Sequence, residues 1–166
     1  MKNLYPDIYI RSISCITASM LSEMGMEAVV LDVDNTLVPH NDPNPTKEVW
    51  DFLSDMRYGG IKLCVVSNNK RERVEPFCKR LGIEYFVWDA LKPRAYGYLK
   101  AAEVMGIKPE NTAAIGDQIF TDIWGGNRAG CLTILVEPIK LGNEGVFIAF
   151  KRLLEKIVLK NKEREK

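Results

Sequence analysis

Two aspartates, Asp32 and Asp34, follow directly after an apolar stretch and are separated by one residue. The stretch 29–31 has the composition of a buried strand, and alternate residues of an extended chain face the same side. Both carboxylates are therefore expected to project into one space. Because two ionised carboxylates in one space repel each other, the pair requires a cation, a shared proton or phosphate chemistry between them.

Polar residues follow the later apolar stretches of the chain in the same manner. Ser67 and Asn68 follow a second predicted strand, Lys92 follows a third, and Asp117 follows a fourth, with Asp122 five residues beyond it. Each has an ordinary explanation on its own, such as helix capping for Ser67 or a solvated surface position for Lys92. Ligands of open parallel sheets bind beyond the carboxyl ends of the strands, so polar residues at all of these ends favour one shared site.

This combination of residue types suits phosphoryl transfer. An aspartate can attack phosphorus and carry the phosphoryl group as a covalent aspartyl-phosphate. A second acid two residues later can protonate the leaving oxygen and then deprotonate the attacking water. Mg²⁺ would offset the charge of the carboxylates, with Asp117 completing its site, while Ser67 and Lys92 hold the phosphoryl oxygens.

The apolar pattern predicts strands that alternate with helices. Predicted strands cover residues 28–32, 61–66, 85–88, 112–115 and 132–136, and predicted helices cover residues 46–58, 70–81, 95–105, 122–128 and the tail from residue 146. This alternation is typical of an α/β fold, with a parallel sheet of about five strands and helices on both faces.

The segments DVDNTL, VVSNN, LKP and GDQIFTD resemble, in order, the four motifs of the haloacid dehalogenase (HAD) superfamily of phosphatases. The resemblance implies a three-layer Rossmann-like fold and Mg²⁺ as the cofactor. The resemblance also implies a role for each matching residue. Asp32 is the nucleophile and binds the metal together with Asp117, while Asp34 supplies its backbone carbonyl to the metal and its side chain as general acid and base. Asp122 orients the metal site, Lys92 steadies the nucleophile, and the substrate phosphate is bound by Thr36, Ser67, Asn68 and Lys92. Asn35 stands where many members have Gly, at a position that contributes mainly backbone.

The spacing between the motifs predicts that no cap domain covers the site. Thirty residues lie between Thr36 and Ser67 and twenty-four between Ser67 and Lys92, and a helix and a strand use up each interval. An independently folded cap would need on the order of 50 further residues. The chain therefore resembles the capless subclass III, and its open site suits a large substrate or a phosphate on a membrane surface. The zinc-loop members of that subclass carry a Cys/His cluster, which this chain, with His40 as its only histidine, lacks.

More narrowly, LYPDIYIRSISCIT, DVDNTLVPHND and GDQIFTDIWGGNRAG resemble the bacterial YqeG family. That family is similar to mitochondrial phosphatidylglycerophosphate phosphatases, which implies a lipid phosphate monoester as a candidate substrate. Residues 146–159 interleave apolar and basic side chains, as in a helix that lies on an anionic membrane. The ordinary alternative, which we favour, is that this helix packs its apolar side on the sheet.

Composition indicates one soluble domain. The chain has 166 residues and a net charge of +1, which predicts no nucleic-acid partner. We expect an N-terminal extension (1–27), a catalytic core (28–136) and a C-terminal basic helix (144–166).

No apolar run is long enough to cross a membrane and no signal-peptide layout is present, so we expect a cytoplasmic protein, with peripheral contact to the inner membrane face left open. Three of the four cysteines lie in apolar stretches, which favours buried thiols. A homo-oligomer whose neighbouring subunit shields the site also stays open.

Two other classes of function fit parts of the pattern. A receiver-type signalling domain also places acids, a Ser or Thr and a lysine around Mg²⁺, but its phosphorylated aspartate lies on a different strand from the acidic pair. Here the candidate nucleophile has an acid two residues later, which favours turnover over storage of the phosphoryl group. The other class is a non-catalytic site kept for binding a partner. Among phosphatase substrates, a nucleotide, a nucleic-acid end and a phosphoprotein remain alternatives to the lipid.

Overall fold

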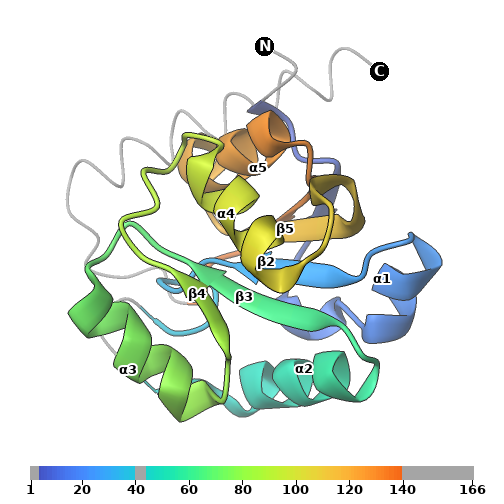
Figure 1. The fold of residues 1–166 in the computed structure, drawn as a ribbon. Helices are drawn as coiled ribbons and strands as arrows, with labels where there is room; N and C mark the ends of the chain where they lie inside the picture. The colour runs from blue at the N-terminus through green and yellow to red at the C-terminus, as the bar shows by residue number, and fades with distance from the viewer. Residues whose placement is uncertain (1–3, 40–43, 140–166) are drawn as a thin grey trace.

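The computed structural model describes residues 4–39 and 44–139 (Figure 1). Its centre is one sheet of six strands in the order β1-β6-β5-β2-β3-β4. All neighbouring strands in the sheet run parallel. The strands are β1 (Ile8–Ile10), β2 (Ala28–Leu31), β3 (Lys62–Val66), β4 (Tyr85–Val87), β5 (Thr112–Gly116) and β6 (Leu132–Val136). The predicted α/β fold with a parallel sheet is confirmed.

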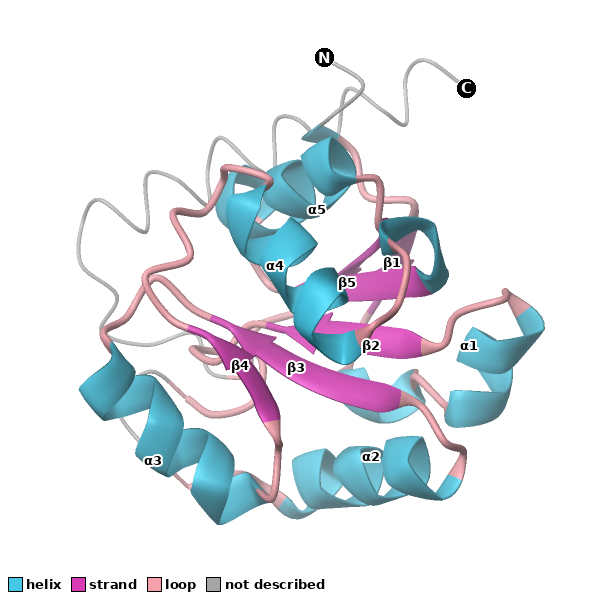
Figure 2. Cartoon of the chain, in the orientation of Figure 1, coloured by secondary structure: helices cyan, strands magenta, loops and turns pink. Residues whose placement is uncertain are grey.

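Helices cover both faces of the sheet, as Figure 2 shows. The α-helices are α1 (Ala18–Glu23), α2 (Lys47–Tyr58), α3 (Arg71–Leu81), α4 (Tyr96–Met105) and α5 (Trp124–Ala129), and the short turns are the 3₁₀ helices η2 (Ile13–Cys15) and η3 (Pro109–Asn111) and the π-helix η4 (Ile119–Ile123). Side chains of α1, α2 and α3 pack in one apolar cluster on one face. Side chains of α4 and α5 pack in a second cluster on the other face.

Strand β2 is the central support of the sheet. All of its residues are buried, and it pairs with β3 on one side and β5 on the other. Val29 and Leu31 face the α2 and α3 side, while Ala28 and Val30 face α4. A strand covered on both faces has no solvent side, which is why this segment is continuously apolar rather than alternating.

The N-terminal extension holds a strand that the sequence pattern did not predict. Strand β1 pairs with β6 through Ile8 and Ile134, and so forms the sheet edge. Its three residues are too few to show a clear alternation, and the aromatic residue among them, Tyr9, is exposed. The predicted C-terminal helix and His40 lie outside the described residues.

The described parts of the two intervals between motifs contain only the elements that the spacing predicted. Helix α2 and strand β3 lie between Thr36 and Ser67, and helix α3 and strand β4 lie between Ser67 and Lys92. Within residues 44–91 there is therefore no cap domain.

Among residues 4–39 and 44–139, no helix combines the length and apolar character needed to cross a bilayer.

Strand β1 is tied to β6 by a side chain as well as by the ladder. The Asp7 carboxylate accepts hydrogen bonds from the Thr133 backbone N–H at 2.8 Å and from its hydroxyl at 2.9 Å. Thr133 is fully buried, so Asp7→Ala leaves polar groups without this acceptor and should lower the free energy of unfolding by about 1–3 kcal/mol. Urea unfolding measures the loss. The control is Asp51→Ala, which removes an exposed ion pair with Lys47 and should cost at most about 0.5 kcal/mol; equal losses would contradict the role given to Asp7.

Candidate active site

The predicted site residues lie at the carboxyl ends of four adjacent strands. Asp32 follows β2, and its backbone N–H donates to the Ile115 carbonyl of β5. Ser67 follows β3 and donates in the same way to Val87 of β4. Asp117 follows β5 directly and is buried. The sheet order β5-β2-β3-β4 thus brings together segments that are far apart in the chain.

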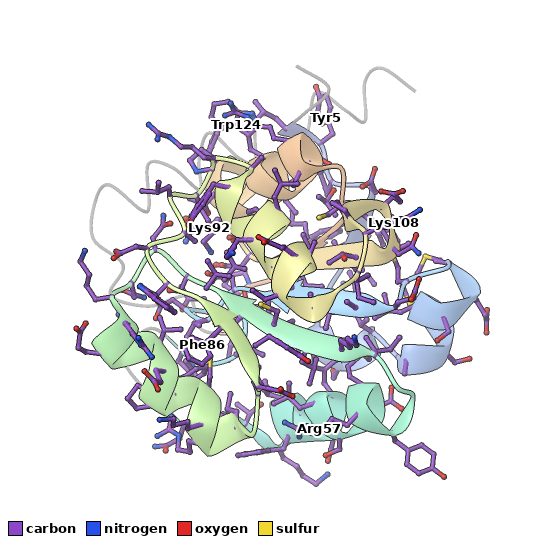
Figure 3. The ribbon with its side chains drawn as sticks, in the orientation of Figure 1. Tyr5, Arg57, Phe86, Lys92, Lys108 and Trp124 are labelled. Atoms are coloured by element: carbon purple, nitrogen blue, oxygen red, sulfur yellow. The ribbon has the colours of Figure 1, made fainter. Side chains whose placement is uncertain are left out.

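Lys92 is the electrostatic centre of the site. Its ammonium group forms ion pairs with Asp32 and, at 2.8 Å, with Asp122, and only 5% of its side chain is exposed. Figure 3 labels this lysine, which lies in the connection between β4 and α4. Asn68 fixes the backbone there, because its Oδ1 accepts from the Lys92 N–H at 2.7 Å and its Nδ2 donates to the Lys92 carbonyl at 3.2 Å. Asn68 therefore holds the Lys92 backbone in place. Its predicted contact with the substrate stays a prediction.

Burial and ion pairing shift the pKa values of this pair. Burial alone would lower the pKa of Lys92, but the carboxylates of Asp122 and Asp32 outweigh it and hold the pKa above its usual value. The lysine therefore stays charged. Burial raises the pKa of Asp32 to about 7, and the nearby Asp122 carboxylate adds to this rise while Lys92 opposes it.

Asp122 reaches the site from the π-helix η4. Its backbone N–H donates to the Gln118 carbonyl at 2.8 Å, and its Oδ2 accepts from the Gln118 N–H at 3.1 Å. Gly116 makes this position possible, since a Cβ there would lie 2.4 Å from the Cβ of Asp122. The sequence predicted a plain helix from residue 122, whereas the structure has a π turn followed by α5. Such turns are rare and often lie at functional sites.

The acidic residues of the site suit a divalent cation. Carboxylate oxygens of Asp32, Asp117 and Asp122 all lie within 4.8 Å of one another. Three carboxylates against the single charge of Lys92 leave a surplus of negative charge in a mostly buried space. Hard oxygen donors with surplus negative charge fit a divalent metal. Both oxygens of Asp122 accept hydrogen bonds, from Lys92 and from the Gln118 N–H. The orienting role predicted for Asp122 stays a prediction.

Asp34 is neutralised separately from Asp32. Its Oδ1 accepts from Arg73 Nη2 of α3 at 2.6 Å, and its Oδ2 accepts from Asn69 Nδ2 at 3.2 Å. The sequence predicted a cation, a shared proton or phosphate chemistry between the two acids. Among the described residues, each aspartate also forms an ion pair with a basic side chain of its own. Asn69 also donates to Ser67 Oγ from both its backbone N–H and its amide, each at 3.1 Å.

Sequence reasoning did not assign Asn69 and Arg73 to the site. The one indication in the sequence was their spacing: Arg73, in the first turn of α3, lies four positions after Asn69, which precedes the helix. Arg73 Nη1 donates to Asn69 Oδ1 at 3.2 Å, as this spacing allows.

Thr36 and Lys92 line different hollows of the described surface. The Thr36 hydroxyl is buried and has no hydrogen-bond partner among the described residues, and its side chain lines a hollow shared with Arg11 and Val136. Its expected contact with a phosphoryl group stays a prediction. The neighbouring Asn35 has a left-handed backbone, with φ of 64°. Asn tolerates this conformation better than most residues, which explains how it replaces the Gly common at this position.

The fold and the site place the chain in a known class of enzymes. It belongs to the haloacid dehalogenase-like hydrolases, whose family model matches residues 43–130. Its similarity to one relative extends over almost the whole length: it is 38% identical over 158 residues to the protein of Bacillus subtilis (strain 168) described as "Probable phosphatase YqeG". The match covers 95% of this chain and 91% of that protein. The predicted family and the predicted enzyme class, a phosphatase, are confirmed.

Two further comparisons are weaker. The chain is 27% identical over 172 residues to phosphatidylglycerophosphate phosphatase 1 of Arabidopsis thaliana, and it spans 47% of that protein. Among solved structures, a HAD family hydrolase from Deinococcus radiodurans R1 superposes with a TM-score of 0.56 at 18% identity, over 78% of this chain and 89% of that one. The latter is a likeness of fold.

The raised pKa of Asp32 gives a pH dependence that can be measured in the metal-free protein. Between its ordinary pKa of 3.8 and about 7, the native state keeps a proton on Asp32 that the unfolded state has released. The contribution of this group to stability therefore falls as the pH rises through this window. Asp32→Asn removes the titration. The free energy of unfolding of the variant minus that of the natural protein should therefore increase as the pH is raised from 5 to 7. Thermal unfolding with a chelator present measures this, and a difference that does not change with pH would contradict it.

Proposed function

We propose that this chain is a Mg²⁺-dependent phosphomonoesterase with Asp32 as nucleophile, Asp34 as general acid and base, and Asp117 as a metal ligand. The observation that carries the proposal is the buried Lys92, which contacts both Asp32 and Asp122 beside Asp117. A buried lysine between two carboxylates holds them in a fixed geometry, and a preorganised charge of this kind stabilises a transferring phosphoryl group.

The first step transfers the phosphoryl group to the protein. A carboxylate oxygen of Asp32 bonds to phosphorus while the bond from phosphorus to the leaving oxygen breaks. Asp34 gives its proton to the leaving oxygen, so the product departs as an alcohol. Ser67 Oγ accepts two hydrogen bonds from Asn69, which leaves its own O–H as a donor to a phosphoryl oxygen.

The second step releases phosphate. A water oxygen bonds to the phosphorus of the aspartyl-phosphate while Asp34 accepts a proton from that water, and the bond to Asp32 breaks. Mg²⁺, when bound by Asp32, Asp117 and the backbone carbonyl of Asp34, offsets negative charge on the carboxylates and on the phosphoryl oxygens. Lys92 stays protonated throughout and keeps the Asp32 carboxylate in position.

We further propose a membrane lipid phosphate, phosphatidylglycerophosphate or a close relative, as the substrate. One supporting observation is the similarity to the Arabidopsis thaliana enzyme. Another is the surface beside Lys92, where a hollow of about 390 Å³ is lined by Leu91, Lys92 and Arg94 among others. Leu91 is 52% exposed, and an apolar tip next to a basic residue suits the boundary between lipid chains and an anionic head group.

Hydrolysis of para-nitrophenyl phosphate tests the reaction. We expect turnover that is lost on chelation, restored by Mg²⁺, and reduced at least 10³-fold, on the order of the loss for removed nucleophiles, in Asp32→Asn. Asp117→Asn should raise the Mg²⁺ concentration needed for half-maximal rate. A Mg²⁺-dependent phosphoprotein that never releases phosphate would instead support a signalling domain, and no reaction at all would support a binding site.

A substrate panel tests the lipid assignment. Phosphatidylglycerophosphate in anionic vesicles should be hydrolysed with a higher kcat/KM than soluble sugar phosphates, nucleotides, nucleic-acid ends or phosphopeptides. Soluble monophosphates that outpace the lipid by orders of magnitude would reject it.

Leu91→Asn should selectively slow hydrolysis on vesicles. Asn tolerates the left-handed backbone at this position, where φ is 56°, but it contributes no apolar contact. Loss of one buried leucine side chain corresponds to about 1.5–3 kcal/mol, or roughly 10- to 100-fold in vesicle-based kcat/KM, with para-nitrophenyl phosphate unchanged. Tyr58→Asn is the control, because Tyr58 is 97% exposed at the far end of α2. Equal effects of the two variants on vesicles would show that Leu91 does not meet lipid.

A further inference from the structure

Two residues, one in helix α3 and one just before it, donate hydrogen bonds to the Asp34 carboxylate. Arg73 donates to one carboxylate oxygen at 2.6 Å, and Asn69, just before the helix, donates to the other at 3.2 Å. Each oxygen therefore has its own donor, which fixes both the direction and the plane of the carboxylate. A single contact would leave the carboxylate free to rotate about its last bond.

The same two residues are hydrogen-bonded to each other, and Asn69 is also hydrogen-bonded to Ser67. Arg73 donates to the Asn69 side-chain oxygen at 3.2 Å, and Asn69 donates to Ser67 Oγ at 3.1 Å. This gives a continuous chain of hydrogen bonds from α3 through Asn69 to both Ser67 and Asp34. A chain of this kind couples the position of the carboxylate to that of the serine hydroxyl.

The Arg73 contact differs from the other ion pairs on this helix. Arg71 pairs with Glu75 one turn further along α3, a contact local to the helix surface. Arg73 instead reaches a residue 39 positions earlier in the chain, at the end of β2. The two arginines are similarly exposed, at 55% and 51% of their side chains, so exposure does not distinguish them.

We propose that Arg73, together with Asn69, is a positioning residue that orients the Asp34 carboxylate for proton transfer to the leaving oxygen. This inference rests on the proposed function, in which Asp34 is the general acid and base. A proton donor is effective only when it lies within hydrogen-bond reach of the atom it serves, so misorientation of Asp34 slows the steps in which its proton moves. Binding of the phosphoryl group depends on Ser67, Lys92 and the metal and is left intact.

The test compares esters that need different amounts of help from an acid. A nitrophenolate leaves phosphorus without protonation, whereas an alkoxide must be protonated as it leaves. We expect Arg73→Met to lower kcat/KM for ethyl phosphate roughly 10- to 100-fold, and for para-nitrophenyl phosphate by less than about threefold, consistent with the usual size of acid catalysis. KM should change little, and Arg73→Lys should recover part of the ethyl phosphate rate because it restores a donor to Oδ1. Arg71→Met, matched in helix and exposure, should change neither rate.

Each outcome bears on the inference. Equal loss for both esters with a raised KM would show that Arg73 binds substrate and would overturn the positioning role, and so would no loss for either ester. Thermal unfolding of Arg73→Met and Arg73→Lys checks that both variants are folded.

Asp34→Asn separates this inference from the proposed function. Selective loss of ethyl phosphate hydrolysis in Asp34→Asn, without it in Arg73→Met, would overturn only the positioning role. Natural rates in Asp34→Asn would overturn the proposed acid and base itself.

Discussion

The arrangement of the site depends on one buried charge, the ammonium group of Lys92. Its side chain is 5% exposed, so it can remain charged only beside the carboxylates of Asp32 and Asp122. Removing one partner of a buried pair leaves the other charge uncompensated, at a cost of about 3–5 kcal/mol. Two neighbouring residues position the members of this ion-pair cluster. Asn68 holds the Lys92 backbone by two hydrogen bonds, and Gly116, which has no side chain, leaves the space that Asp122 occupies.

Much of this arrangement could be predicted because the features are local in sequence. Strand β2 is apolar throughout since both of its faces are covered, and the residues after β2, β3, β4 and β5 are polar because those strand ends converge. The remaining features depend on distant partners. Strand β1 is too short to show a period, and its pairing with β6 depends on residues at the other end of the described chain. The π turn at η4 depends on the space beside Gly116, which a pattern of apolar residues does not reveal.

Asp32 and Asp34 have different contact partners, although only one residue separates them. Alternation along a strand predicts that both carboxylates enter one space, but β2 ends at Leu31, before both aspartates. Asp32 therefore contacts Lys92, while Asp34 contacts Arg73 and Asn69. Because each acid pairs with its own cation, the contacts are compatible with the different roles proposed for them, nucleophile for Asp32 and general acid and base for Asp34. This separation was not visible in the sequence because Arg73 lies 39 positions from its partner.

The pairing of β1 with β6 has a consequence for the order in which the chain can fold as it leaves the ribosome. The ladder and the Asp7–Thr133 contacts join segments 126 residues apart, so β1, the first of the described strands, gains its neighbour only after the last of them, β6, has been synthesised. The inner strands can pair earlier during synthesis. Strand β2 can pair with β3 as soon as α2 and β3, which follow it in the chain, have been synthesised. Since loop closure over longer distances is slower and costs more entropy, we expect β1 to dock late, onto a sheet whose other described strands are already paired. Among the described strands, β1 is therefore the one whose backbone waits longest for a pairing partner during synthesis.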